Sequence, residues 1–427
     1  MQQLQRELGV FGATMMGLGS IVGTGIFVSV GIAAGVAGPA VLLAIAIAAL
    51  VATANGLSSA QLAANHPVSG GTYEYGYRYL NPRLGFTAGW VFLLAKSASA
   101  ATAALGFAGY LLDALGVGDP RWLTPLALAA VAAFTAIVLA GIRRSNTANT
   151  VIVSLTLAAL VVFIVTGLPS VQSANLTPVL PTGDGGLASL LQATALMFVA
   201  YTGYGRIATM GEEVKSPQRT IPRAIITTLV VSMLLYMAVA FVGVGTVGAP
   251  ALAAATETLA APLEAAAAVF ASPLVARIVA VGAMTAMLGV LLNLILGLSR
   301  VLLAMGRRGD MPPVVGRLNA AGTTPTAAVL VMGAVIAGLA LLGNVKTTWS
   351  FSAFTVLIYY AITNLASLRL GSPERIFPRW IAMSGLLACL FLAFWVEPTI
   401  WLAGLALIGL GLLWQYAARW LFGPVNS

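Results

Sequence analysis

The sequence has 427 residues, of which 59% are hydrophobic and only 8% charged, and its mean hydropathy is +0.97. This composition excludes a soluble protein and is typical of a polytopic helical membrane protein. A single cysteine (Cys389) and a single histidine (His66) exclude an intramolecular disulfide and argue against a metal centre or histidine-based catalysis, so we expect neither a metal nor a cofactor.

Apolar runs of about 20 residues, long enough to cross a bilayer, recur along the whole chain. The first run is too long for a cleavable signal peptide and has no clear cleavage site. We predict an all-α fold of twelve membrane-spanning helices over residues 8–34, 39–64, 84–112, 122–142, 149–168, 187–211, 222–247, 273–305, 325–343, 349–370, 377–395 and 399–421.

The basic residues are distributed unequally between the two sides of these spans. With the N-terminus in the cytoplasm, 16 of the 21 Lys and Arg residues fall in cytoplasmic segments, three fall in outer segments, and Lys96 and Arg206 fall within spans. This positive-inside bias predicts a protein of the plasma (inner) membrane with both termini in the cytoplasm. The net charge of +9 therefore reflects topology in a lipid bilayer, and we expect no nucleic-acid partner.

The first span is interrupted at its centre by the sequence GSIVGTGIF, residues 19–27. Glycine destabilises a helix by about 1 kcal/mol relative to alanine, and a backbone group freed in hydrocarbon needs another partner. The stretch therefore predicts a broken helix that lines a protected cavity, with the positive end of its second half directed at a carboxylate. The alternative is a close-packed helix seam between Gly19 and Gly23.

A second interruption, FVAYTGYGR at residues 198–206, lies in the sixth span. Spans 1 and 6 each begin a group of five spans, and paired interruptions at corresponding positions indicate a midplane site between inverted repeats. We predict a transport core over 1–370, with repeats over 8–168 and 187–370, and two additional spans over 371–427. We predict that residues 252–270, between spans 7 and 8, form an amphipathic helix over the bundle. The alternative is an ordered loop.

The chain resembles the amino acid–polyamine–organocation (APC) superfamily of permeases in four motifs. They are residues 19–27, the sequence PVSGGTYEY at 67–75, the sequence GEEVKSPQRTIPRA at 211–224, and the segment from Ser299-Arg300 to Pro325. The resemblance implies a secondary transporter of amino acids or related amines that works by alternating access, and no enzyme activity.

The resemblance also implies a substrate site at the two interruptions. The amides of Gly23, Thr24 and Gly25 would bind the substrate carboxylate. The ammonium group would lie against the carbonyl groups of Ile21, Val199, Ala200 and Thr202. Tyr201 would close over the substrate and Tyr204 would lie within reach, although both tyrosines could instead be packing residues. The neighbouring wall would be the small face Ser97, Ala98, Ala101 and Thr102.

The expected coupling groups of the family are missing from this chain. Proton-coupled relatives carry a lysine where alignment puts Thr156, and sodium-coupled relatives carry hydroxyl groups where this chain has Gly289 and Val290. Thr156 and Thr285 are the remaining polar candidates for a cation, unless their hydroxyl groups bond to their own helices. A facilitator or an exchanger therefore fits better than a strongly driven symporter.

Two cationic residues within spans are functional candidates, because an ionisable group at membrane depth is expensive. Lys96 could reach back to the interface, face a cytoplasmic vestibule, or replace the missing helix-5 ammonium and permit proton coupling. Arg206 could attract an acidic substrate, form an inner gate with Glu212 or Glu213, or bond to the unwound backbone. We expect a transporter of neutral L-amino acids. The alternative is a proton-coupled symporter or an exporter of polar or acidic amino acids or amines that uses Lys96 or Arg206.

Overall fold

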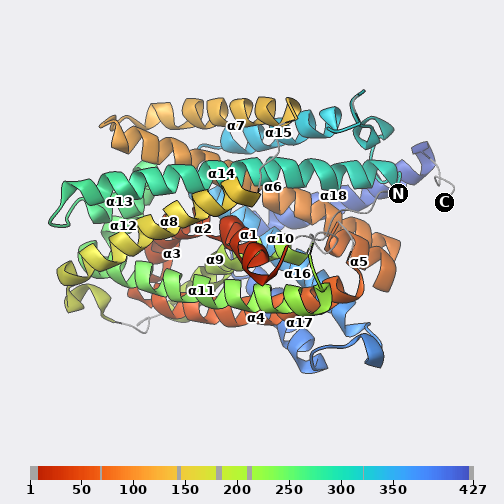
Figure 1. Ribbon diagram of the computed structural model, residues 1–427, viewed down its shortest axis with the longest axis horizontal. Coiled ribbons are helices and arrows are strands. Elements are labelled where there is room, and N and C mark those ends of the chain that lie inside the picture. Colours follow the sequence, from red (N-terminus) through yellow and green to blue (C-terminus); the bar gives the residue numbers. More distant parts are fainter. Residues whose placement is uncertain are drawn as a thin grey trace.

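The computed structural model describes residues 8–67, 70–141, 146–178, 185–208, 214–320 and 322–422. Within these ranges the regular structure is helical, and the long helices α4, α6, α11 and α14 run along the length of one bundle (Figure 1). The helices are α1 Val10–Ile21, α2 Thr24–Phe27, α3 Ser29–Ala37, α4 Val41–Asn65, α5 Thr72–Tyr79, α6 Pro82–Ala114, α7 Leu123–Leu139, α8 Asn146–Gly167, α9 Gly186–Tyr201, α10 Gly205–Ala208, α11 Pro217–Val247, α12 Ala249–Leu259, α13 Pro262–Ala267, α14 Pro273–Arg307, α15 Thr326–Ala340, α16 Val345–Leu368, α17 Arg379–Ala393 and α18 Pro398–Phe422.

Nine apolar helical segments in the described ranges are long enough to cross a membrane, and α1, α15 and α17 are shorter apolar helices. The predicted polytopic helical membrane protein is therefore confirmed. The count of twelve spans and the inverted repeat stay predictions, although each predicted range overlaps an apolar helix or a group of consecutive helices.

Proline and asparagine residues set the starts of several helices. Proline occupies the first turn of α6, α11 and α14, where its missing N–H needs no partner. The side chain of Asn81 accepts a hydrogen bond from the Leu84 amide and caps α6, and Asn344 caps α16 in the same way. These caps place the two helices that form one wall of the candidate site.

The predicted amphipathic segment over 252–270 folds as two short helices, α12 and α13. Ala260 between them adopts a left-handed conformation (φ 56°), and Pro262 starts the second helix. Figure 1 shows α12 and α13 at one end of the bundle and α5 at the opposite end. The segment is thus helical as expected, but a turn at Ala260 divides it.

Helices α12 and α13 dock closely on α3 and α6. A side chain at Gly31 would lie 2.0 Å from the Thr256 hydroxyl, and one at Gly109 would lie 1.5 Å from the Leu259 carbonyl oxygen. The Tyr110 hydroxyl donates to the carbonyl of Phe27 (2.8 Å) and accepts from the Leu263 amide (3.3 Å). The turn around α13 is therefore bonded, through α6, to the end of α2.

A buried carboxyl group lies in this same docked helix. The Glu264 side chain on α13 is buried, and its Oε2 atom has no hydrogen-bond partner among the described residues. Burial, together with the nearby Asp113 carboxyl, raises the pKa of Glu264 to about 8. The docked position of α13 therefore favours the protonated form of Glu264.

At the opposite end, α5 is bound to the end of α14 by a polar cluster. The hydroxyl groups of Tyr73 and Tyr77 donate to the Asp310 carboxylate at 2.7 and 2.6 Å. Arg308 pairs with Glu74 at 2.6 Å and lies 4.2 Å from the centroid of the Tyr77 ring. These contacts fix α5 to the end of α14.

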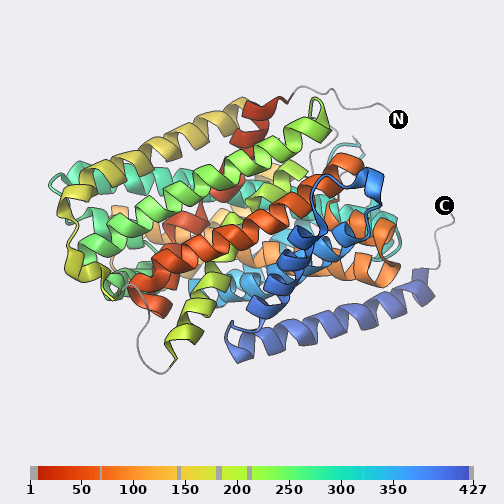
Figure 2. The same ribbon diagram turned by 90° about the horizontal axis from the view of Figure 1, so that it is seen from below.

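The last two helices pack on the outside of the bundle. Helix α17 packs against α4 and α16, and α18 packs against α6 and α16. Figure 2 shows α18 lying along one edge of the molecule. The Trp414 indole donates to the Asp310 backbone carbonyl at 3.0 Å, so α18 is also bonded to the cluster beside α5.

Candidate functional site

The first predicted break is present, because α1 ends at Ile21 and α2 begins at Thr24. Val22 is extended (φ −80°, ψ 94°), and the chain passes through Gly23 before it resumes a helical course. The amides of Ile26 and Phe27 donate to the Gly23 carbonyl oxygen, at 3.0 and 3.1 Å. The amides of Gly23, Thr24 and Gly25 come before these two, and the first amides of a helix have no carbonyl partner within that helix.

The second predicted break is also present. Helix α9 ends at Tyr201, a 3₁₀ turn covers Thr202–Tyr204, and the short helix α10 follows. This turn packs against α1. A side chain at Gly203 would lie 2.4 Å from the backbone carbonyl carbon and oxygen of Ser20, so the two interrupted helices touch backbone to backbone at this point. Only glycine permits so close an approach.

A tyrosine from α11 joins the two breaks. The Tyr236 hydroxyl lies 2.8 Å from the Ile21 carbonyl oxygen and 3.1 Å from the Ala200 carbonyl oxygen. The Tyr360 hydroxyl, from α16, donates to the Thr202 carbonyl at 3.1 Å. Three of the four carbonyl groups that we expected at the substrate ammonium therefore lie within hydrogen-bond distance of a tyrosine hydroxyl.

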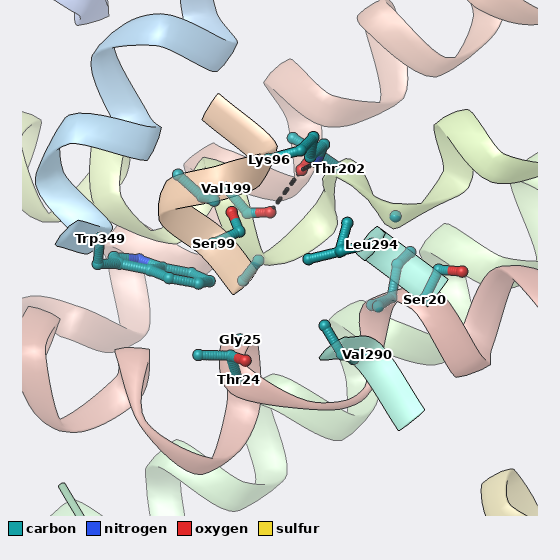
Figure 3. Close-up of a pocket in the computed structure, with 13 residues that line it drawn as sticks. Ser20, Thr24, Gly25, Lys96, Ser99, Val199, Thr202, Val290, Leu294 and Trp349 are labelled. Carbon is teal, nitrogen blue, oxygen red and sulfur yellow. Dashed lines mark hydrogen bonds between the residues drawn. The ribbon is translucent and has the colours of Figure 1, made fainter. Parts of the chain in front are cut away.

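A small central cavity lies between the breaks. Figure 3 shows Thr24 and Gly25 at one end, Lys96 and Thr202 at the other, and Trp349 and Leu294 on opposite sides. Its lining comprises Ser20, Ile21, Thr24, Gly25, Lys96, Ser99, Val199, Ala200, Thr202, Gly203, Val290, Leu294 and Trp349.

This lining contains most of the residues that the resemblance implied at the two interruptions. Ile21, Thr24, Gly25, Val199, Ala200 and Thr202 all face the cavity, and Gly23 adjoins it in the chain. The Thr24 hydroxyl is buried and has no hydrogen-bond partner among the described residues. It is therefore available to a ligand.

A wider cavity adjoins the central one and shares with it Ser20, Lys96, Thr202, Gly203, Val290 and Leu294. It extends towards the α5 end, where Gly70 and Arg300 line it, and Arg206, Tyr359 and Tyr360 form part of its wall. The central cavity thus adjoins a cavity that extends towards one end of the bundle. Glu212 and Glu213, the possible gate partners of Arg206, lie outside the described residues.

Lys96 lies between the two cavities and contributes to both linings. Its ammonium donates to the Thr202 hydroxyl at 2.9 Å, and that hydroxyl donates to the Val199 carbonyl at 2.8 Å. The side chain therefore reaches the second break. Because Lys96 lines both cavities, its side chain does not reach back to the interface, and the vestibule role and the replacement of the helix-5 ammonium both stay predictions.

The predicted small wall on the third span is wrong. Lys96 and Ser99 face the central cavity, whereas Ser97, Ala98, Ala101 and Thr102 do not line it. Thr102 instead contacts Thr348 of α16 at 2.8 Å. The error is a rotation of α6 about its axis, because an apolar helix buried on most sides carries no periodic signal that fixes its orientation.

Neither predicted tyrosine of the second break lines the central cavity. The Tyr201 ring packs against Tyr236, with 5.1 Å between ring centroids, and its hydroxyl donates to the Ile45 carbonyl at 3.3 Å. The Tyr204 ring packs against Tyr360 at 5.4 Å. Both therefore occupy packing positions, the alternative stated from sequence.

The two threonine candidates for a cation site bond to their own helices. The Thr156 hydroxyl donates to the Ile152 carbonyl at 2.8 Å, and the Thr285 hydroxyl donates to the Val281 carbonyl at 2.8 Å. Neither lines the central cavity. This is the satisfied arrangement that such residues commonly adopt in helices.

Sequence reasoning missed Ser99, Trp349, Tyr236 and Tyr360. The Trp349 indole donates to the Leu196 carbonyl at 2.9 Å, which holds its ring against the cavity. Aromatic residues in apolar helices are most often packing residues, and no short motif marks these positions. Only the fold brings α11 and α16 to the two breaks.

Comparison with known proteins shows that the chain is similar to transport proteins over nearly its whole length. A sequence profile described as amino acid permease matches residues 12–427. An uncharacterized transporter of Mycobacterium tuberculosis is 40% identical over 409 residues, which cover 96% of this chain and 90% of the relative. A branched-chain amino acid permease of Bacillus subtilis is 30% identical over 446 residues (98% and 94%), and a methylthioribose transporter of the same organism is 31% identical over 395 residues (87% and 83%).

Proposed function

The chain belongs to the amino acid permease family, whose members are transporters and not enzymes, and from this premise we propose that it carries neutral L-amino acids by alternating access. We propose that it is a facilitator or an exchanger rather than a strongly driven symporter. The relative named as a branched-chain amino acid permease supports a neutral substrate. The apolar sides of the central cavity, Val290, Leu294 and Trp349, support the same class.

We further propose a topology of twelve spans in the plasma membrane, with both termini in the cytoplasm. The five-plus-five inverted repeat would comprise 8–168 and 187–370, and residues 371–427 would add two spans. The positive-inside distribution of Lys and Arg supports this orientation. In it, the α5 end of the bundle is cytoplasmic and α12 and α13 are extracellular, so the wider cavity opens inwards.

The observation that carries the proposal is the contact of two broken helices around one cavity. Unsatisfied amides at the start of α2 suit a carboxylate, and carbonyl groups at the second break suit an ammonium. We assign the substrate carboxylate to the amides of Gly23, Thr24 and Gly25. We assign the ammonium to the carbonyl groups of Ile21, Val199, Ala200 and Thr202.

The coupling proposal rests on what occupies the expected ion positions. Thr156 and Thr285 bond to their own helices, and no Lys or Arg occurs between Arg144 and Arg206. A protein without a built coupling site equilibrates or exchanges its substrate. We therefore expect substrate binding that does not depend on sodium.

A thermal-shift screen of the purified protein against the twenty amino acids tests this function, because a ligand of the native state raises the melting temperature. The screen runs in sodium and in choline buffers, at pH 5.5 and 7.5. Ligands that stabilise are then tested for counterflow in proteoliposomes. Stabilisation by neutral amino acids in both buffers is expected. No stabilisation and no counterflow with any amino acid would refute the proposal.

A second candidate function follows from the position of Lys96. Its ammonium faces the cavities and contacts the second break, so a proton on Lys96 could be linked to substrate binding. This favours a proton-coupled symporter, or an exporter of polar or acidic amino acids in which Arg206 also takes part. Stabilisation in the same screen only at pH 5.5 would support this candidate over the first.

A further inference from the structure

The ammonium of Lys96 has unused hydrogen-bonding capacity at the central cavity. A lysine ammonium carries three donors, and among the described residues its one hydrogen bond is to Thr202. No described carboxylate lies within ion-pair distance of it. Because Lys96 lines the central cavity, the other two ammonium hydrogens are at the cavity wall.

The charged residues around both cavities have one sign. Lys96, Arg206 and Arg300 line them, and no Asp or Glu is among the described lining residues. A cation in a site of low dielectric constant is expensive unless an acceptor or an anion reaches it. Like charges repel, so this lining disfavours a substrate with a cationic side chain.

The cavity also has two ends that suit electronegative groups. Figure 3 shows Thr24 and Gly25 at one end and Lys96 at the other, with Trp349 and Leu294 on the sides between them. A substrate whose α-carboxylate lies at the amide end directs its side chain between the apolar walls. The far end of that side chain then meets the Lys96 ammonium.

We propose that Lys96 is a specificity-determining residue that binds a terminal carbonyl oxygen of the substrate side chain. The preferred substrates would then be amino acids that end in a carboxamide or a carboxylate. This inference rests on the proposed amino acid transport: the carboxamide form narrows the neutral class, and the carboxylate form corresponds to the second candidate function. Glutamine and asparagine represent the neutral form of this chemistry, and glutamate and aspartate represent the anionic form.

Binding of glutamine, glutamate, leucine and alanine to the purified full-length protein tests the proposal. The wild type should bind glutamine or glutamate at least tenfold more tightly than leucine, because a hydrogen bond to a charged group gives about that factor or more. Whichever of glutamine and glutamate binds more tightly shows whether the site prefers a carboxamide or a carboxylate. A wild type that prefers leucine to both would overturn the inference and leave the proposed function intact.

The substitution Lys96→Met keeps the unbranched chain to within one atom of its length and removes its charge and donors. It should weaken binding of glutamine or glutamate about tenfold or more and leave leucine and alanine within about threefold. Equal loss for all four amino acids would show that Lys96 binds a group common to them, such as the α-carboxylate, and would overturn the inference. Lys96→Gln provides a second variant if the methionine variant does not fold.

Lys346→Met is the matched control, because it removes the same charge from a side chain near Glu397 that lines neither cavity. Its binding profile should equal that of the wild type. Failure of the wild type to bind any amino acid would refute the proposed function itself. The two failures are therefore distinguishable.

Discussion

Replacing Gly203 by alanine tests whether the two broken helices must touch. The added methyl carbon would lie 2.4 Å from the carbonyl carbon and oxygen of Ser20, whereas unbonded carbon atoms rest at about 3.5–4.0 Å. The obstructing atoms belong to the backbone and not to a flexible side chain. Relief therefore requires a shift of about 1 Å between the two breaks.

The expected magnitude follows from this overlap. Overpacking of a close contact destabilises by about 1–3 kcal/mol, which corresponds to a factor of about 5 to 150 in an equilibrium constant. Because the shift separates the groups on the two sides of the cavity, we expect substrate binding to weaken by a factor in this range. The melting temperature of the unliganded protein should also fall.

The assay is equilibrium binding of the best-stabilising amino acid, combined with counterflow in proteoliposomes. Gly338→Ala is the matched control, since nothing lies within 4 Å of a side chain at that position in α15. It should leave both measurements unchanged. Wild-type affinity and wild-type melting temperature in Gly203→Ala would refute the argument that the two breaks depend on this contact.

Three further predictions concern side chains around the bundle. Tyr236→Phe removes the hydroxyl shared by Ile21 and Ala200 and should weaken binding about 5- to 100-fold; unchanged affinity would show that the bridge is dispensable. The pKa of Glu264 is raised from its ordinary 4.5 to about 8 in the folded protein, so its contribution to stability is complete at low pH and is lost as pH rises through about 8. The melting temperature should therefore fall from pH 5 to 9, and Glu264→Gln should flatten this slope. Equal slopes in the wild type and the variant would contradict the assignment. Asp310→Ala removes the carboxylate that accepts from the hydroxyl groups of Tyr73 and Tyr77 and should lower the melting temperature at unchanged substrate affinity. The control Arg121→Ala, which breaks an exposed ion pair, should alter neither quantity. Weaker binding in Asp310→Ala would instead link the cluster to the site.

The positions of the helices and of both breaks could be predicted from sequence for a physical reason. The bilayer requires long apolar runs, and glycine with threonine in the middle of such a run at 19–27 conflicts with that requirement. The conflict identifies the break without any knowledge of the partners. The same reasoning located the second break at 198–206.

The rotation of α6 and the identity of the bridging tyrosines could not be predicted in this way. Most of α6 is buried, so its pattern does not distinguish Ser97 from Ser99. Tyr236 lies 215 residues from Ile21, and the hydroxyl group reaches it only because α11 packs against α1. Contacts of this kind depend on the packing of several helices, which hydropathy does not encode.

The shared hydroxyl of Tyr236 has a consequence that appears when hydrogen atoms are counted. One phenolic hydrogen faces two carbonyl oxygens, so at any moment at most one of Ile21 and Ala200 receives it fully. The Tyr236 hydroxyl alone therefore cannot fully satisfy both carbonyl oxygens at the point where the two broken helices meet. In the proposed function, the substrate ammonium brings further hydrogens to these two carbonyl oxygens. The tyrosine thus bonds the two breaks to each other, and the carbonyl oxygen that it serves less fully can accept from the ammonium of the proposed substrate.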